Sequence, residues 1–546
     1  MLYHPTTIIL TSVIALIISF KHNRVFNIIA LLLPIVSAAI FFNFAENDSI
    51  EIANLTFFFS FSNYDTLISI SFFCVLFAAN SYSIGQNKKL EIILGSCYGA
   101  FAFMSLFAKD FISMFIGLEL MMVFSSAIIF IGGARASLRS AKKYFITHLM
   151  SSNMIIIGIT YLITKNNDLT IVPATSLLDD PNYSSPMLYI MLVGMLINIA
   201  AFPFSGWMVK YYPKASPSGF LYLISFTTKV SVILLAKIFL GLEEMKYVAI
   251  IMIFYSSFKA MMEENIFSLL CYLSIMSMGL MLLGISVGTE EAILATTCYL
   301  FIHIVYKSLL SISAAILVDE GAINNCQDIK KINNKILLLG ITVGILMMAN
   351  IPLSSSFTVK SALSHLFHDS LTYATIIFLS FMTVFILPWK KYFRSSKSTE
   401  ITLNIYSKVS IIFMTLTLVA IAVSGKHIPV LNEINSFNKM DIFSFDVFKQ
   451  VVIIFTALFT SYLYMTSRKD TKPINFIEWL GDVFFELYAN WMNIRVQKDE
   501  TGEPWAFNNL EKQTANKLGS IHNQQNAIFI VFTIFIVMLL VLTTSI

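Results

Sequence analysis

The chain has 546 residues, of which 57% are hydrophobic and only 12% are charged, and its formal net charge at pH 7 is +4. Soluble domains are about 25% charged, so this composition excludes an ordinary soluble enzyme or nucleic-acid-binding domain. Apolar stretches of about 20 residues recur from end to end, which predicts an all-α polytopic membrane protein. The five cysteines have neither metal-binding nor redox spacing.

Hydropathy predicts about sixteen helices, of which about 14 to 16 would cross the membrane. The first residues lack a basic start, so they are read as a first span and not as a cleavable signal peptide. The expected helices cover residues 5–20, 25–44, 64–84, 90–108, 110–132, 142–164, 186–205, 217–241, 245–259, 265–287, 290–318, 334–356, 371–388, 405–425, 448–466 and 525–544.

Positive charges are concentrated in every second predicted loop. Counted with the adjoining helix ends, the odd-numbered loops up to residue 398 carry 18 lysines and arginines, whereas the even-numbered loops up to residue 447 carry 5 besides Lys360. Cytoplasmic loops are enriched in Lys and Arg, so this bias predicts that the odd loops are cytoplasmic. Both termini would then lie on the outer, periplasmic side.

Two prolines, Pro203 and Pro352, lie inside predicted helices that are five helices apart. Proline removes a backbone donor and breaks a helix, and such breaks in membranes are tolerated where they are buried or line a wet cavity. We therefore expect an inverted repeat of two five-helix bundles, at 90–241 and 245–388, each with one broken helix. Two unrelated prolines are the alternative.

The remaining segments flank this repeat. N-terminal transmembrane helices are expected within 1–84 and additional ones within 405–466. Residues 467–524 are polar, with apolar residues at helical spacing, which predicts an amphipathic helix at the cytoplasmic surface or on a partner subunit. A last transmembrane helix is expected at 525–544.

Ionisable residues inside the predicted spans are the candidates for function, because each is disfavoured there by about 2.5–3.5 kcal/mol. His303 and Lys307 are four residues apart and share one helix face. Glu119 and Lys229 lie near the middle of their helices, and Lys360 follows the break at Pro352. A structural ion pair is the alternative for Glu119 with Lys229.

Three further polar residues have simpler explanations. Asp65 opens its helix and, like Lys360, could extend to the membrane surface from a helix end. His148 could be a hydrogen-bonded packing residue, and Asn198 could satisfy backbone groups freed near Pro203. We treat His148, Asn198, Pro203 and Pro352 as secondary site residues.

The spacing of acid, lysine and histidine is typical of proton conduction. Burial disfavours a charged lysine and a nearby carboxylate favours it, so moving a partner charge can load or unload the proton. The sequence shows no phosphate-binding loop, haem ligands or flavin motif, so no cofactor or metal is expected. The driving energy would come from an ion gradient or from partner subunits.

Several motifs in order resemble the antiporter-like subunits that respiratory complex I (its L, M and N subunits) shares with Mrp-type cation/proton antiporters. They are GLELMMVFSSAIIFIGG with KKYF, NIAAFPFSGWMVKYYPKASPSGFLYLISFTTKV, LLCYLSIMSMG, FIHIVYKSLL and ANIPLSSSFTVK, and the resemblance covers about residues 60–395. It implies a proton relay made of Glu119, Lys229, His303, Lys307 and Lys360.

The chain departs from this family at Asn198, where the family usually has a lysine paired with the glutamate. Asparagine cannot hold a proton, so the resemblance leaves the first half either impaired or rewired through His148. A degenerate structural subunit and, from a different class, a solitary channel therefore stay open as alternatives.

Within the family we expect the D-type subunit of an Mrp-type Na+ or K+/proton antiporter first, and an M- or N-like subunit of NADH-quinone oxidoreductase as the alternative. Either would sit in the bacterial inner membrane with other hydrophobic subunits, in contact with lipid and with no nucleic acid. The chain would be a transporter subunit and not an enzyme by itself.

Overall fold

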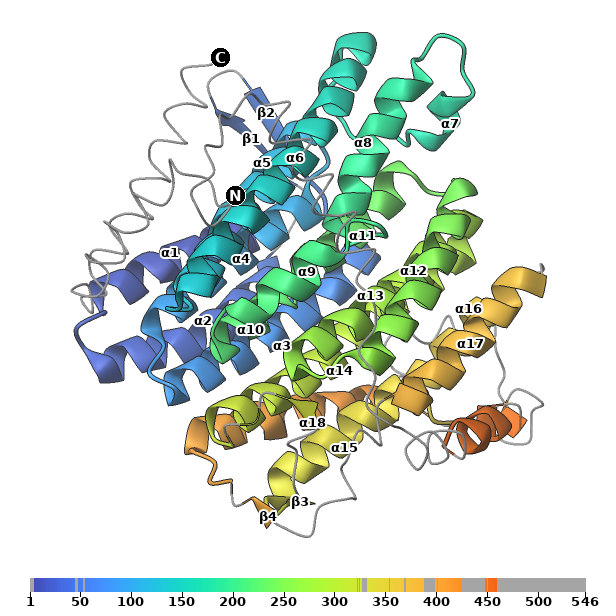
Figure 1. Cartoon of the computed structure of the whole chain (residues 1–546). Helices are drawn as coiled ribbons and strands as arrows, with labels where there is room; N and C mark the ends of the chain where they lie inside the picture. Colours follow the sequence, from blue (N-terminus) through green and yellow to red (C-terminus); the bar gives the residue numbers. More distant parts are fainter. Residues whose placement is uncertain are drawn as a thin grey trace, which may run out of the picture.

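Helices dominate the computed structural model, as the composition predicted. The structure describes residues 4–44, 48–52, 55–321, 323, 325–326, 331–352, 354–367, 370–386, 398–399, 401–424, 447–448 and 450–458. Within these residues, ten helices are long and apolar enough to cross a membrane, and four shorter apolar helices accompany them. Most lie side by side (Figure 1), which confirms the all-α polytopic fold.

The N-terminal region contains α1 (Pro5–Ile18), α2 (Asn23–Phe44) and α3 (Asn63–Gly85). Between α2 and α3 lies an antiparallel hairpin of β1 (Asp48–Ile52) and β2 (Leu55–Phe59). The sequence predicted no regular element between the helices expected at 25–44 and 64–84. Isoleucine, threonine and phenylalanine favour strands, and Ile50 pairs with Phe57 across the hairpin, so local β-propensity explains the difference.

Two runs of helices follow, and the fourth helix of each run is broken. The first run consists of α4 (Lys89–Phe107), α5 (Phe111–Phe130), α6 (Arg135–Asn166), α8 (Ser185–Asn198) with α9 (Gly206–Tyr211), and α10 (Pro217–Leu223) with α11 (Thr227–Ile238). The second consists of α12 (Glu244–Met262), α13 (Ile266–Val287), α14 (Glu290–Asp319), α15 (Lys335–Met348) with α16 (Ser355–His365), and α17 (Ser370–Ile386).

Short elements connect these helices. They are α7 (Thr175–Leu178), the 3₁₀ helix η1 (Tyr212–Lys214) and a parallel pair of short strands, β3 (Lys331–Ile332) and β4 (Ser398–Thr399). After the second run, α18 (Ile405–Ser424) packs against α3, α14 and α15.

The two runs keep a common register. The residues that cap the first three helices of each run are 155 positions apart: Lys88 with Glu243, Asp110 with Asn265, and Ala134 with Thr289. A tyrosine–histidine pair repeats with the same shift, Tyr144 and His148 on α6 against Tyr299 and His303 on α14. An odd number of helices per run reverses the direction of the second, so the repeat is inverted.

The two breaks share one backbone geometry. Left-handed residues follow α8 and α15, with φ +60° at Ala200 and +50° at Asn350, which are 150 positions apart. Pro203, preceded by a cis peptide bond, and Pro352 lie just beyond. Equivalent hydrogen bonds close the two helix ends, from Ala201 N to Leu196 O at 2.9 Å and from Ile351 N to Leu346 O at 3.4 Å.

Polar residues begin many of the helices. Their side chains accept a hydrogen bond from a backbone N–H that has no partner within the first helical turn, and this stabilises a helix start by about 1 kcal/mol. The residues that act in this way include Ser62, Asp110, Ser216, Asn265, Thr289, Asn334 and Ser354.

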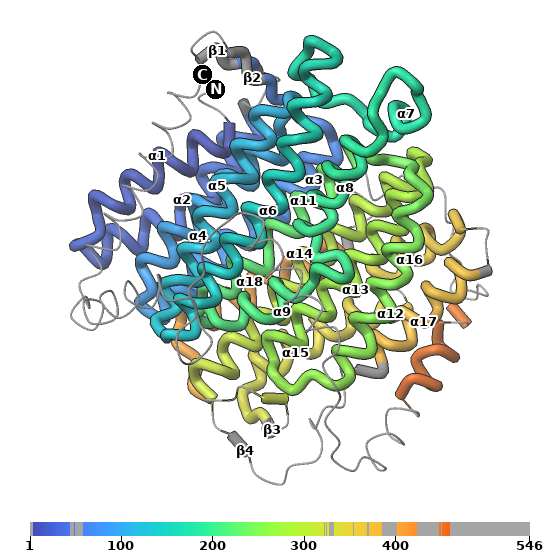
Figure 2. The backbone as a smooth tube through the Cα atoms, turned by 45° about the horizontal axis from the view of Figure 1, so that its top comes forward, coloured from blue at the N-terminus to red at the C-terminus, as the bar shows by residue number. Residues whose placement is uncertain are grey.

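Helix α14 lies in the interior of the molecule. It packs against α3, α10, α13, α15, α16 and α18 and is buried over most of its length (Figure 2). Small residues allow close packing here: a Cβ on Gly344 of α15 would lie 2.8 Å from the Leu310 side chain of α14. The helix that carries His303 and Lys307 is therefore surrounded by protein.

The expected amphipathic segment at 467–524 and the last transmembrane helix at 525–544 lie outside the described residues. Of the helix expected at 448–466, the structure describes 447–448 and 450–458, and residues 450–458 are helical.

Candidate functional site

The buried polar groups meet around α14. His303 and Lys307 are 0% and 1% exposed. His303 Nδ1 is 2.8 Å from the Tyr306 hydroxyl, while Lys307 Nζ and His303 Nε2 have no hydrogen-bond partner among the described residues. Burying an ammonium without a partner is strongly unfavourable, so Lys307 favours its neutral form unless a charge or water approaches.

Lys229 lies at a second interruption that sequence analysis did not predict. The helix expected at 217–241 is wrong in this respect, because the structure divides it into α10 and α11 and ends α11 at Ile238. The interruption frees the Ile224 carbonyl, which accepts a hydrogen bond from Lys229 Nζ at 2.6 Å; Thr228 Oγ1 accepts another at 3.0 Å. The break thus supplies the partner that the buried lysine needs.

A tyrosine from α4 supports this interruption. The Tyr98 hydroxyl forms a hydrogen bond with Thr227 Oγ1 and accepts one from the Thr227 N–H at 3.0 Å. Thr227 is the first residue of α11, so Tyr98 satisfies a helix-start donor from outside the helix. This long-range contact has no local sequence signal, which explains why the interruption was missed.

The structure brings Lys229, His303 and Lys307 together. The three groups lie close enough to interact electrostatically with one another. The thiol of Cys271, on α13, is near both lysines. Its spacing in the sequence indicated neither a metal site nor a redox role. Its position makes it a polarisable neighbour of the cluster.

In the first run, Glu119 contacts the Ser152 hydroxyl of α6, and its Oε1 has no partner among the described residues. Glu119 and Lys229 therefore do not form the ion pair considered from the sequence, since Lys229 is bonded to Ile224 and Thr228. One turn away on α6, His148 lies on the same face as Ser152. Ser152 thus links Glu119 to the face of α6 that carries His148.

His148 and Asn198 are in direct contact. His148 Nδ1 is 2.9 Å from Asn198 Oδ1, and because an amide oxygen only accepts, Nδ1 is the donor. The buried Nε2 then keeps the free lone pair and has no partner among the described residues. The Ser151 hydroxyl donates either to Gly194 O (2.7 Å) or to Asn198 Oδ1 (2.9 Å).

Aromatic rings extend from this histidine toward the centre. The His148 ring packs on Tyr144 and Trp207 with centroids 4.3 and 4.6 Å away, and Tyr144 is 5.7 Å from Tyr212. Ser125 Oγ donates to the Tyr144 hydroxyl at 2.9 Å. The Tyr212 hydroxyl is buried with no partner in the described part of the chain.

Lys360 lies on α16, after the second break. Its side chain is 4% exposed and Nζ has no hydrogen-bond partner within the described ranges. It lines a small cavity of about 40 Å³ between α16, α17 and the helix at 450–458. The other polar residues of the lining are Ser361, Ser364, Tyr373, Ser380 and Gln450.

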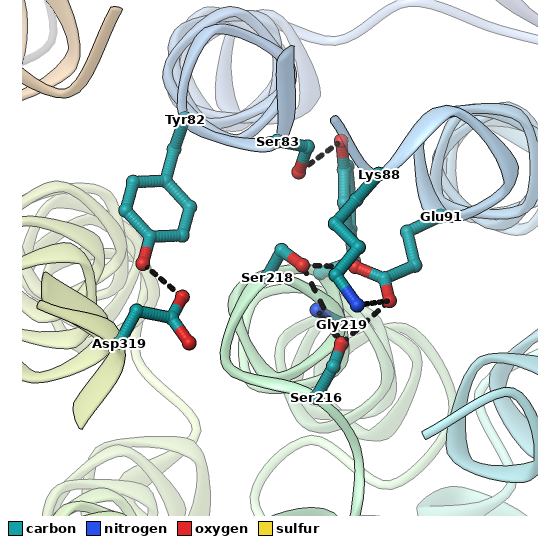
Figure 3. A network of polar contacts seen from close by, with 9 residues as sticks. Tyr82, Ser83, Lys88, Glu91, Ser216, Ser218, Gly219 and Asp319 are labelled. Carbon is teal, nitrogen blue, oxygen red and sulfur yellow. Dashed lines mark hydrogen bonds and ion pairs between the residues drawn. The ribbon is translucent and has the colours of Figure 1, made fainter. Parts of the chain in front are cut away.

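A second polar network, absent from the predicted site, joins α4 to α10 (Figure 3). Glu91 is 2% exposed and accepts hydrogen bonds from Ser216 Oγ at 2.7 Å and from Ser218 Oγ, with Lys88 Nζ at 3.9 Å. Lys88 is one of the positive charges counted in the odd-numbered loops. An acidic residue in a first helical turn is a normal helix-dipole feature, so Glu91 alone gave no signal.

A further polar pair near this network involves α14. The Tyr82 hydroxyl donates to Asp319 Oδ2 at 2.5 Å (Figure 3). The Tyr222 hydroxyl donates to Asn80 Oδ1 at 2.7 Å. At the far end of α3, Asp65 is paired with Lys237 at 3.3 Å and does not simply extend to the surface. No group of three or more His, Cys, Asp or Glu side chains that could hold a metal occurs among the described residues.

Comparisons with known proteins agree with this architecture. The family model described as NADH:quinone oxidoreductase/Mrp antiporter, TM, matches residues 108–387. Relatives include NADH-quinone oxidoreductase subunit N 2 of Solibacter usitatus, 30% identical over 42% of this chain and 51% of the relative. Subunit N 1 of Thermodesulfovibrio yellowstonii is 26% identical over 50% of this chain and 61% of the relative.

Solved structures show the same fold. A chain of the Mrp complex from Dietzia sp. has a TM-score of 0.66 at 14% identity, covering 83% of this chain and 99% of that one. A chain of respiratory complex I from Thermus thermophilus has a TM-score of 0.65 at 15% identity, covering 78% and 98%. At these identities the likeness concerns the fold alone.

The named relatives favour the complex I alternative over the D-type Mrp protein that sequence analysis placed first, because they are called subunit N. The chain matches about half to three fifths of the length of these relatives. The family model itself spans residues 108–387, which is 280 of the 546 residues. The chain therefore belongs to the NADH:quinone oxidoreductase/Mrp antiporter transmembrane family.

Proposed function

We propose that this chain is a proton-translocating membrane subunit of an assembly related to NADH-quinone oxidoreductase, with an N-like role. The observation that carries the proposal is the buried cluster of Lys229, His303 and Lys307, in which Lys307 Nζ has no partner among the described residues. A cluster that disfavours several simultaneous positive charges takes up and releases protons as its surroundings change.

The second run supplies the route away from the cluster. Lys307 lies on α14, and α14 packs directly against α16, which carries Lys360. The Nζ atoms of both lysines lack partners within the described ranges, and the cavity beside Lys360 is large enough for a few water molecules. Protons would pass from Lys307 to Lys360 and leave through water there.

The first run supplies the route toward the cluster. Glu119 would hold the proton first, and His148, one turn of α6 from the Glu119–Ser152 contact, would accept it at the free Nε2. Asn198 cannot titrate, and in this proposal it orients His148 through Nδ1. Tyr144, Tyr212 and Thr227 lie between His148 and Lys229 and would carry the proton with bound water.

The relatives' names support an assembly with other hydrophobic subunits in a bacterial inner membrane. Gentle purification of the tagged chain, followed by mass spectrometry, tests this part. Quinone-reductase subunits with flavin and iron–sulfur clusters would support the complex I role. Small antiporter subunits without them would replace it with a monovalent cation/proton antiporter, in which the same cluster would exchange protons for Na+ or K+.

Lys307→Ala tests the relay itself. We expect at least a hundredfold loss of proton transport in membrane vesicles, while the assembly still forms, because the central proton carrier is removed. Lys165→Ala, at an exposed position near the end of α6, is the matched control and should transport normally. Wild-type transport by Lys307→Ala would eliminate the relay and leave a structural subunit.

A further inference from the structure

The helix at 450–458 is attached to the second break by one side chain. Gln450 is buried, and its Nε2 lies 3.3 Å from Ala349 O and 3.2 Å from Asn350 O. These carbonyls follow the last turn of α15, where the break leaves them without the helical donors they would otherwise have. Each hydrogen of the amide can serve one carbonyl.

Among the described residues, the first break is supported from within its own helix pair. There, Trp207 Nε1 donates to Ile197 O at 2.8 Å, so a residue of α9 itself supports the end of α8. The equivalent residue in the second run, 150 positions later, is Phe357, which has no donor. The second break therefore depends on a donor from another part of the chain, and Gln450 provides one.

The same helix forms a wall of the Lys360 cavity. Gln450 and Ile453 line it on one side, and Lys360, on α16, lines it on another. A water molecule needs about 10–15 Å³ of such space and several polar partners, and this cavity offers about 40 Å³ with serine, tyrosine and amide groups. An unpartnered buried lysine beside it points to water as the occupant.

Apolar contacts also join this helix to the second break, since Ile454 and Leu458 pack with Ile351. Its Ala457 belongs to a small apolar cluster with Ala349 and Val384, separate from the main core. Its outward residues Val452 and Phe455 are 44% and 74% exposed. The amide of Gln450 adds hydrogen bonds to the carbonyls of the break, which these apolar contacts do not supply.

We propose that the helix at 450–458 closes a water-filled proton-release chamber at Lys360, and that Gln450 is a positioning residue that fixes the second break against this chamber. The inference rests on the proposed function and adds the residue and the wall that complete its exit. The proton leaves Lys360 Nζ for chamber water, and the neutral lysine then accepts the next proton from the Lys307 side.

Two variants of the full chain in its native assembly test the two parts. Gln450→Met keeps the size of the side chain but removes both donors, and we expect transport to fall about tenfold. Ile453→Phe leaves Gln450 in place but fills the chamber, and we expect a similar fall. Val452→Ala, on the exposed side of the same helix, is the control and should transport normally.

Gln450→Glu tests whether the side chain at position 450 lies close enough to Lys360 to change its proton affinity. It places a carboxylate opposite Lys360, and Tyr373 is the other titratable residue of the lining. The pH dependence of transport should then move to higher pH, because a carboxylate stabilises the charged lysine. An unchanged pH profile would show that position 450 does not face Lys360 across the chamber, and would overturn this wall.

The outcomes are distinct from those of the Lys307 experiment. Normal transport by both Gln450→Met and Ile453→Phe would overturn the chamber while leaving the relay intact. If Gln450→Met prevents assembly, Ile453→Phe decides: slowed transport supports the chamber and normal transport overturns it. Normal transport by Lys307→Ala removes the proposed function itself.

Discussion

The two runs place their ionisable groups on opposite members of the same helix pair. In the first, the acid Glu119 lies on α5 and faces Ser152 of α6. The positions 155 residues later are Ser274 on α13 and Lys307 on α14, so the base lies on the second helix and serine on the first. Ser274 Oγ and Lys307 Nζ are both buried without partners in the described part of the chain.

This contrast shows what the repeat preserves and what it does not. Helix starts, the tyrosine–histidine pair and the breaks recur, so the repeat supplies the positions. The sequence then assigns an acid to one run and a base to the other. An acid on the first helix of one pair and a base on the second helix of the other give the two runs different proton affinities.

The equivalent histidines of the two runs, His148 and His303, test whether the runs contribute differently to proton transport. His303→Phe should lower proton transport by about a hundredfold, because His303 interacts with both Lys229 and Lys307. His148→Phe should lower it by about tenfold, since Glu119 and bound water can still pass protons. Transport in vesicles, normalised to assembled complex, is the measurement. Equal losses would mean that the two runs contribute alike.

Asn198 tests whether the first run works through orientation. Asn198→Leu removes the acceptor of His148 Nδ1, and we expect a loss of about fivefold to tenfold, which corresponds to roughly 1 kcal/mol for one hydrogen bond. Asn198→Asp retains an oxygen acceptor, and it should stay within about threefold of the wild type. If Asn198→Leu transports normally, His148 does not depend on this contact.

Much of this arrangement was predictable from the sequence. Helix positions followed from hydropathy, and Pro203 and Pro352 indicated two related breaks, because proline acts locally. The repeat had a further signal in the sequence: Tyr144 with His148 and Tyr299 with His303 have the same spacing. The His148–Asn198 contact joins different helices, so only the packing of α6 on α8 reveals it.

Other features depended on packing alone. The interruption before Lys229 requires Tyr98 from α4, and the support of the second break requires Gln450, 100 residues away from Asn350 in the chain. Glu91 is bonded to Ser216 and Ser218 across more than 100 residues. Local propensity contains none of these pairings, so one sequence alone does not predict them.

Ser152 and Ser274 test the same difference between the runs, with smaller expected effects on transport. Ser152→Ala removes a contact of Glu119 and should lower transport about threefold to fivefold. Ser274→Ala removes a hydroxyl that has no protein partner within the described ranges, so its effect should stay under about threefold unless it holds water for Lys307. A larger loss for Ser274→Ala than for Ser152→Ala would place the ordered water in the second run.

The smallest expected effect concerns the backbone of the two breaks. Ala200 has a φ of +60°, which disfavours a residue with a Cβ by about 1–2 kcal/mol, whereas asparagine, as at Asn350, tolerates this region better. Ala200→Gly should therefore raise stability by up to about 1 kcal/mol, after the larger entropy of glycine in the unfolded chain is subtracted. Thermal inactivation in detergent measures this, and Ala201→Gly, one residue later, should lower stability. A lower stability for Ala200→Gly would show that surrounding packing, and not the turn itself, sets the conformation of the first break.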